Sequence, residues 1–213
     1  IMRLMLNDAT WSQKQAALIN VLQAGIDWFG MVNAGGGWTA NGGHATGRKQ
    51  MIFFAGMMFD SSEMKAVLAN PALHTFCEND FVTMGSVANR PLWGFPSSDP
   101  DDYWDQINNG TGRRDLADPT GQIDGGYSTG AGYQSISTNT FAEAALMVHL
   151  MSGASVWAHD DFLDYVDRWV NFGAWTQPDT ETANRPAFWS THGTGNRTTY
   201  RNAFLRAMWS AYR

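Results

Sequence analysis

The sequence predicts an all-α protein built of antiparallel helical hairpins with long irregular loops. Apolar residues recur at helical spacing from Leu18 to Val32, and the segment from Arg48 to Phe59 is apolar nearly all round, so it should be buried on most sides. No segment alternates convincingly between polar and apolar residues, as a half-buried strand would. With 213 residues and 44% hydrophobic composition, the chain can bury one sizeable core. We expect a single helical domain over residues 1–213 and, because the chain begins at Ile1, a fragment or processed part of a larger protein.

Capping residues and glycines predict where the N-terminal helices begin and end. Ser12 and Gln15 have the spacing of a capping box at the start of the first long helix, and the run Ala34-Gly35-Gly36-Gly37 should end it. After the second helix, Asp60-Ser61-Ser62-Glu63 should cap a third, short helix, which ends at Asn70-Pro71 because proline disfavours helix at the preceding residue.

Helical spacing disappears between Ala72 and Thr138, where Gly, Pro, Asp and Asn are frequent. Aromatic residues scattered through this stretch argue against disorder and favour binding loops or a lid. Further helices should run from Thr140 to Gly153, from Asp160 to Gly173 and from Thr199 to Tyr212. Paired helices joined by such loops suggest an open ring or superhelix with the loops gathered at one end.

Composition and charge narrow the class of function. The net charge of −6 and the pI near 5.2 argue against a nucleic-acid binder, and no apolar run is long enough to span a membrane. Cys77 is the only cysteine, so an internal disulfide is excluded. The cations are 11 Arg and 3 Lys, and arginine suits bidentate recognition of carboxylate or sulfate. The 10 Trp residues favour contact with sugar rings, although most of them should lie in the core.

The segment Asn41-Gly-Gly-His-Ala-Thr-Gly-Arg-Lys49 is the most informative motif. Its glycines permit a tight turn before a buried helix, and the turn would carry an imidazole at His44 and cations at Arg48 and Lys49. His44 could transfer a proton near neutral pH, while the two cations could hold an anionic ligand. The structural alternative is a turn whose histidine only hydrogen-bonds a neighbouring loop. The spacing is not that of a P-loop, because Gln50 follows the lysine.

Three segments together resemble the helical toroid region of the heparinase and alginate-lyase-like group of bacterial polysaccharide-degrading proteins. They are Gly25-Ile26-Asp27, the Asn41 to Lys49 motif with its buried helix, and Trp157-Ala-His-Asp-Asp-Phe-Leu-Asp-Tyr-Val-Asp-Arg-Trp169. The resemblance covers about Leu18 to Phe172 in pattern and contains no complete catalytic signature. It implies that the helices form part of an (α/α) toroid, usually followed by a β-sandwich, in a secreted or periplasmic protein. The chain is too short for a full ring, so further domains of the same protein are expected.

The resemblance implies cleavage of an acidic polysaccharide by β-elimination. A lyase of this kind needs a group that neutralises the sugar carboxylate, a base for the adjacent ring proton and an acid for the leaving oxygen. We expect His44, Tyr133 and His192 to be catalytic. For substrate binding we expect Asn41, Arg48, Lys49, Trp104 and Tyr127. His149 is expected in the core, and His159 should lie at the start of a helix.

Two other classes of function remain open. A glycoside hydrolase needs a pair of carboxyl groups, for which Asp27, Asp124, Asp161 and Asp164 are available. A helical ring with aromatic loops could also bind glycan without cleaving it, or serve as a structural extracellular subunit. No cofactor is expected, although loop oxygens such as those of Asn79-Asp80 could bind Ca²⁺.

Overall fold

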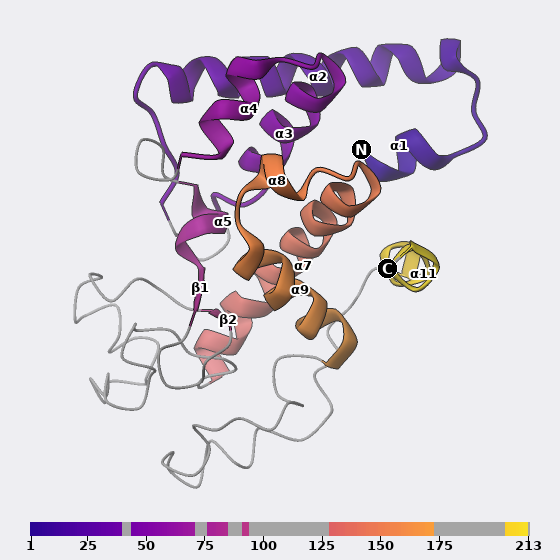
Figure 1. The fold of residues 1–213 in the computed structure, drawn as a ribbon. Helices are drawn as coiled ribbons and strands as arrows, with labels where there is room; N and C mark the ends of the chain where they lie inside the picture. The colour runs from indigo at the N-terminus through magenta and orange to yellow at the C-terminus, as the bar shows by residue number, and fades with distance from the viewer. Residues whose placement is uncertain (40–43, 71–75, 85–90, 94–127, 173–202, 213) are drawn as a thin grey trace, which may run out of the picture.

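The structure, a computed structural model, describes residues 1–39, 44–70, 76–84, 91–93, 128–172 and 203–212, and over these ranges the chain is mostly helical (Figure 1). The predicted helical class is therefore confirmed. None of the helices in these ranges combines the length and apolar character needed to cross a membrane. In chain order the elements are α1 (Met2–Leu6), α2 (Trp11–Asn33), α3 (Arg48–Met58), α4 (Ser62–Leu68), α5 (Cys77–Asp80), β1 (Val82–Met84), β2 (Pro91–Trp93), α7 (Ser128–Leu150), α8 (Ala154–Trp157), α9 (Asp160–Phe172) and α11 (Ala203–Tyr212).

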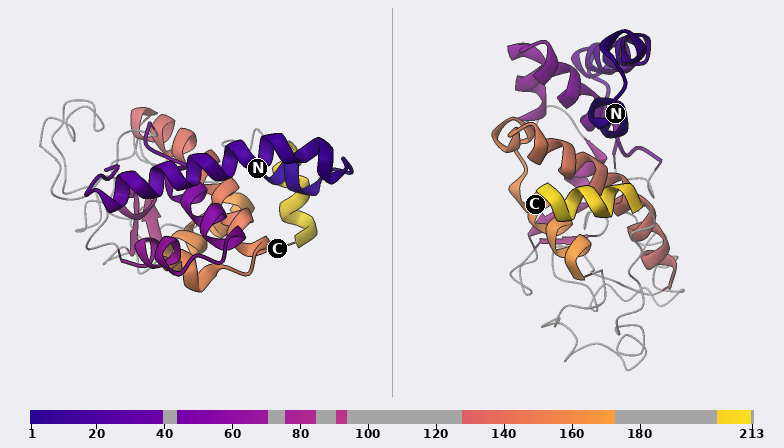
Figure 2. Two further views of the ribbon diagram at one scale, coloured as in Figure 1. Left: turned by 90° about the horizontal axis from the view of Figure 1, so that it is seen from above. Right: turned by 90° about the vertical axis from the view of Figure 1, so that its right-hand side faces the viewer.

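The long helix α2 packs against α3 and forms one side of the molecule (Figures 1 and 2). Leu18, Gly25 and Val32 are buried and lie on one face of α2, since each is two turns from the next. The two helices approach closely at Gly25, where an added Cβ atom would lie 2.5 Å from the Met51 carbonyl oxygen. Only glycine fits this contact without a shift of one backbone.

The cap of α2 differs from the prediction. The Gln13 side-chain oxygen accepts a hydrogen bond from the Thr10 backbone N–H at 2.8 Å. Thr10 and Gln13 therefore form the capping box that we expected from Ser12 and Gln15. The reason is that the helix already begins at Trp11, so its cap must precede that residue.

Helix α3 lies at the centre of the core, as its all-round apolar pattern predicts. Ile52, Phe53, Phe54 and Ala55 are each at most 1% exposed. Helices α2 and α4 both pack on α3. The Phe53 ring meets the edge of Trp157 in α8, with ring centroids 5.8 Å apart. This contact joins the N-terminal helices to the later part of the chain.

A small antiparallel sheet, β1 paired with β2, was not expected from the sequence. Each strand has only three residues, too few for an alternating pattern to be visible. Trp93, on β2, is 1% exposed and stacks on Phe81 with ring centroids 5.1 Å apart. The sheet is thus held to the helical core by aromatic packing, and α9 packs against both strands.

Helix α7 begins at Ser128, well before the start expected near Thr140. The prediction of irregular structure up to Thr138 is therefore wrong from Ser128 onward. Ser137 and Thr138 are completely buried, although both residue types are weak helix formers. The Trp93 indole N–H donates to the Ser137 hydroxyl at 3.1 Å. The hydroxyl groups of Thr138 and Tyr165 are 2.8 Å apart and share a hydrogen bond. These contacts stabilise a helical segment that local propensity does not indicate.

Helices α9 and α11 complete the described fold. Helix α9 begins at Asp160, as predicted, and packs on α7, while α11 lies across α7 near the N-terminal helix α1 (Figure 2). The described part of the last helix begins at Ala203, and the residues before it, where we placed its start, lie outside the described ranges. Leu205 and Trp209 are the buried residues of α11.

The contact between α2 and α3 gives a test with an internal control. Gly25→Ala should lower the free energy of unfolding by about 1–3 kcal/mol, because the new methyl group overlaps the α3 backbone. Gly30→Ala, in the same helix, meets nothing within 4 Å and should raise it by about 0.5–1 kcal/mol through helix propensity. Urea unfolding followed by circular dichroism measures both. Equal effects of the two substitutions would contradict the described packing.

Candidate functional site

The predicted motif forms a turn at residues 44–47 that leads into α3. Gly47 precedes the helix with a φ of 90°, a conformation that residues with a side chain adopt rarely. Its backbone N–H donates to the Glu78 carboxylate at 2.7 Å. The Glu78 carboxylate is favoured at the helix N-terminus by the positive end of the helix dipole. The same carboxylate offsets the two cations at Arg48 and Lys49. Glu78 therefore fixes the turn from the side of α5.

Arg48 contacts two neighbouring indole rings at this turn, whose centroids are 6.3 Å apart. Its guanidinium carbon lies 5.8 Å from the ring centroid of Trp28 and 5.6 Å from that of Trp38. One guanidinium N–H donates to the His44 carbonyl oxygen at 2.8 Å. Trp38 is in turn fixed by Phe76, with ring centroids 6.1 Å apart. We call Trp28, Trp38 and Arg48 the tryptophan–arginine cluster.

His44 lies beside this cluster and is exposed. Within the described part of the chain, its imidazole has no hydrogen-bond partner, and the indole N–H groups of Trp28 and Trp38 have none either. Both tryptophans are half-buried, so their rings are fixed while part of each remains accessible. The turn thus presents several unused donors around a guanidinium whose direction is set in advance.

Lys49 points away from this surface and into the core. It is completely buried, and its Nζ donates to the Asn79 side-chain oxygen and to the Trp157 carbonyl oxygen, each at 2.8 Å. The ammonium also lies 4.4 Å from the Trp157 ring centroid, a cation–π contact. Successive side chains on a helix differ by about 100° in direction, so Arg48 and Lys49 point to different sides of α3. The expectation that both cations meet at one place is therefore wrong.

Burial controls the protonation of this interior cluster. It lowers the pKa of Lys49 from 10.5 to about 7, against the influence of the Glu78 carboxylate. It also raises the pKa of Glu78, opposed by backbone N–H bonds, including that of Gly47, and by the Lys49 and Arg48 charges. The second Glu78 carboxylate oxygen is buried without a partner among the described residues. For His159, burial and the Lys49 charge lower the pKa to about 4.

The other predicted site residues can be placed only in part. Tyr133 lies in α7, but its side chain is outside the described structure. The remaining expected residues also lie outside the described ranges: Asn41, Trp104, Tyr127 and His192. His149 packs edge-on against Trp209, as expected of a core histidine, with ring centroids 5.8 Å apart.

Sequence reasoning missed several residues of this site. Trp28, Trp38 and Glu78 were not proposed, and Asn79 was considered only as a calcium ligand, whereas it accepts a hydrogen bond from Lys49. A carboxylate next to Phe76-Cys77 in an apolar stretch was the one local signal for Glu78. Among the described residues, no group of three or more His, Cys, Asp or Glu side chains could hold a metal ion.

Comparison of the chain with models of protein families, with curated proteins and with solved structures gave no match. The geometry of the site must therefore carry the functional argument.

The buried lysine predicts a distinct dependence of stability on pH. A pKa that is lower in the folded state than in the unfolded state means that the charged ammonium destabilises the fold. This destabilisation is complete below pH 7 and decreases as the pH rises from about 7 towards 10.5. Relative to Lys49→Met, the wild-type protein should gain stability over this window, by at most about 1.4 kcal/mol per pH unit. Chemical denaturation from pH 7 to 10 measures the difference.

Lys65→Met is the matched control, since Lys65 pairs with Asp60 at the surface. The stability of this variant should rise with pH as that of the wild type does, because Lys49 remains in place. If Lys49→Met followed the same pH profile as the wild type, the buried position of the ammonium would be refuted.

Proposed function

We propose that the turn at residues 44–47 and the tryptophan–arginine cluster bind an acidic polysaccharide, and that the protein cleaves it by β-elimination. The observation that carries the proposal is the guanidinium of Arg48, which contacts Trp28 and Trp38 and donates to the backbone carbonyl of His44, an exposed residue. A fixed guanidinium pairs with a carboxylate through two parallel hydrogen bonds at little further cost in conformational entropy.

The surrounding groups favour a sugar acid over a simple anion. The two indole N–H groups and the imidazole offer donors to the hydroxyl oxygens of a sugar, and the indole rings offer apolar surface to its C–H face. A sulfate or phosphate would use the guanidinium but leave this apolar surface uncovered. A polymer of uronic acids uses both.

The steps of β-elimination would be carried out by a few side chains. Arg48 would neutralise the carboxylate of the uronic acid, which acidifies the adjacent ring proton. His44 would accept that proton in its neutral form, and Tyr133 or His192 would donate a proton to the leaving oxygen. Because the imidazole of His44 is exposed and unpartnered in the described structure, a purely structural role for it is disfavoured.

A glycoside hydrolase is the second candidate, favoured by the acidic start of α9. Burial, followed by the Asp164 and Asp160 carboxylates, raises the pKa of Asp161, while a backbone bond from Met84 opposes the shift. A carboxyl group whose pKa is raised, with other carboxyl groups nearby, is one feature that an acid-catalysed hydrolysis needs. Asp27 does not join them in the described structure, where it accepts a hydrogen bond from Gln23 within α2 at 2.8 Å.

The proposal includes the wider setting of the chain. The pairing of α2 with α3 and of α7 with α9 is what neighbouring hairpins of an (α/α) toroid would require. We infer that the chain is part of such a toroid, acts outside the cytoplasm in the secreted or periplasmic fraction, and works with further domains of the same protein. We propose no cofactor, and removal of any bound Ca²⁺ with a chelator tests whether the ion has a role.

Activity on defined polymers decides between the classes of function. Incubation with alginate, pectate and a heparin-type polymer should produce the ultraviolet absorbance of an unsaturated uronide. New reducing ends without this absorbance would replace the lyase by the hydrolase, and binding without either product would replace both by a glycan-binding module.

His44→Ala tests the proton acceptor. Turnover should fall by roughly 10²- to 10⁴-fold, the usual scale for loss of a general base, whereas the melting temperature should stay almost unchanged because the imidazole is exposed. A variant that is less stable but fully active per folded molecule would remove His44 from the mechanism.

Arg48→Lys tests the guanidinium. The charge is kept, but the bidentate geometry is lost and the contact with the two indoles is weakened, so affinity for oligogalacturonate should fall by about tenfold or more in calorimetric titration. Arg206→Lys, an exposed position on α11, should bind as the wild type does. Equal affinities for all three proteins would exclude Arg48 from the binding site.

A further inference from the structure

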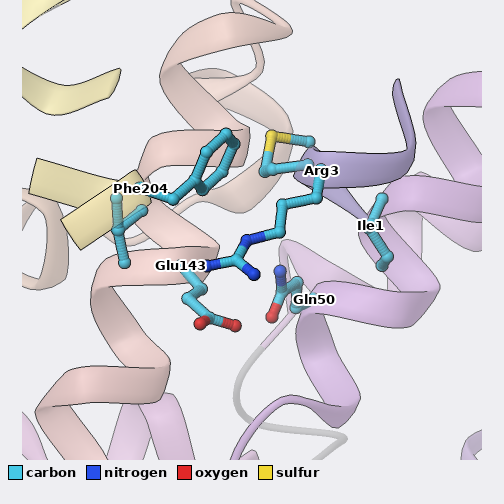
Figure 3. Close-up of a pocket in the computed structure, with 7 residues that line it drawn as sticks. Ile1, Arg3, Gln50, Glu143 and Phe204 are labelled. Atoms are coloured by element: carbon cyan, nitrogen blue, oxygen red, sulfur yellow. The ribbon is translucent and has the colours of Figure 1, made fainter. Parts of the chain in front are cut away.

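Lys49 and Gln50 follow one another on α3 but face different surroundings. Gln50 lines a pocket between α1, α7 and α11 that is partly open to solvent, next to Arg3 and Glu143, which have interaction partners of their own (Figure 3). Lys49 is instead completely buried, and β-elimination at the surface makes no use of it. A buried amine beside a fixed carbonyl group is a candidate nucleophile.

Two hydrogen bonds hold the Lys49 amine against the side chain of Asn79. The Nζ atom lies 2.8 Å from the Asn79 Oδ1 atom and 2.8 Å from the Trp157 carbonyl oxygen. Because a carbonyl bond is about 1.2 Å long, the Asn79 carbonyl carbon is at most about 4 Å from the nitrogen. The amine therefore starts close to the distance of about 3–3.5 Å at which reacting atoms meet.

Apolar surroundings favour the reactive form of this amine. The Nζ atom lies 4.4 Å from the ring centroid of Trp157 and 5.9 Å from that of Phe76, and both residues are at most 1% exposed. Burial disfavours the charged ammonium and lowers the pKa of Lys49 to about 7. Above this pH most of the amine is neutral, and a neutral amine has the lone pair that a nucleophile needs.

Glu78 supplies a proton carrier next to the reacting pair. It precedes Asn79 in α5 and is 1% exposed, and burial raises its pKa. The charges of Glu78 and Lys49 influence each other's pKa, so the two groups are near one another. One carboxyl oxygen accepts a hydrogen bond from the Gly47 N–H, whereas the other is buried without a partner among the described residues. This second oxygen is available to carry a proton between the amine and the amide.

We propose that Lys49 and Asn79 react in the folded protein to form an intramolecular isopeptide bond. The lone pair of Nζ attacks the Asn79 carbonyl carbon, so a carbon–nitrogen bond forms there, and the bond from this carbon to Nδ2 breaks. Glu78 gives its proton to the leaving Nδ2 and takes one from Nζ, so ammonia is released and the carboxyl group is restored. The reaction needs no oxidant or reductant.

The product links α3 to α5 covalently. Such a link restricts the unfolded chain as a disulfide does, but reductants do not break it. The bond also removes the amine that titrates. The dependence of stability on pH described for Lys49 therefore applies to chains that have not reacted, and the mass of the sample has to be measured first.

Mass spectrometry of the full chain tests the proposal. After incubation of the folded protein at about pH 8, its mass should be lower than that of the sequence by about 17 Da, the mass of ammonia. Trypsin does not cut at an acylated lysine, so a digest should contain a branched peptide whose two chains begin at Lys49 and Ala66. Absence of the branched peptide would overturn the proposal. A loss of the same mass that maps to a succinimide at Asn109-Gly110 would overturn it as well.

Variants identify the reacting groups. Lys49→Met and Asn79→Ala each remove one of them, so neither should yield the branched peptide. Glu78→Gln keeps an acceptor for the Gly47 N–H but cannot exchange protons, and the branched peptide should form roughly 10²- to 10⁴-fold more slowly. Lys65→Met, a change at the surface, should react as the wild type does.

Circular dichroism establishes that each variant is folded before its mass is compared. A folded Glu78→Gln protein that reacts at the wild-type rate would exclude Glu78 as the proton carrier. A branched peptide from Asn79→Ala would exclude Asn79 as the acceptor. The measurement needs no saccharide, so its outcome is independent of the proposed lyase activity.

Discussion

The buried Lys49 side chain and its hydrogen bonds are the contacts on which the described fold and its candidate site depend. A charge in the interior is tolerated only when it is hydrogen-bonded and paired, and here Asn79, the Trp157 carbonyl and Glu78 provide those partners. The three partners come from α5 and α8, which are far from α3 in sequence. Lys49 therefore fixes the positions of α5 and α8 relative to the start of α3.

The same cluster sets the geometry of the surface above it. Glu78 accepts a hydrogen bond from the Gly47 N–H, while Arg48, one residue later, contacts Trp28 and Trp38. The helix periodicity thus divides two adjacent cations between a structural and a surface role. A site built on a helix start that is anchored in the core keeps its donors fixed before any ligand arrives, which reduces the entropy lost on binding.

The sequence predicted the structure well where the apolar pattern of a segment matches its burial in the fold. The boundaries of α3 and its buried character followed from an apolar pattern on all faces, and the motif predicted that a buried helix begins at the Gly47-Arg48-Lys49 step. The pattern could not show that Lys49 would be buried, because that depends on acceptors from α5 and α8. The early start of α7 was missed for a similar reason, since Ser137 and Thr138 are stabilised by partners distant in sequence. Arg48 and His44 were found because their motif is local, whereas Trp28 and Trp38 join them only through folding.

The most direct test of the account is the affinity of Glu78 variants for oligogalacturonate, measured calorimetrically on protein shown to be folded. Glu78→Gln keeps an acceptor for the Gly47 N–H and should bind nearly as well as the wild type. Glu78→Leu loses that acceptor, releases the turn and should bind about tenfold or more weakly, although Arg48 and His44 are both present. A folded Glu78→Leu protein with wild-type affinity would contradict the claim that the buried cluster positions the site.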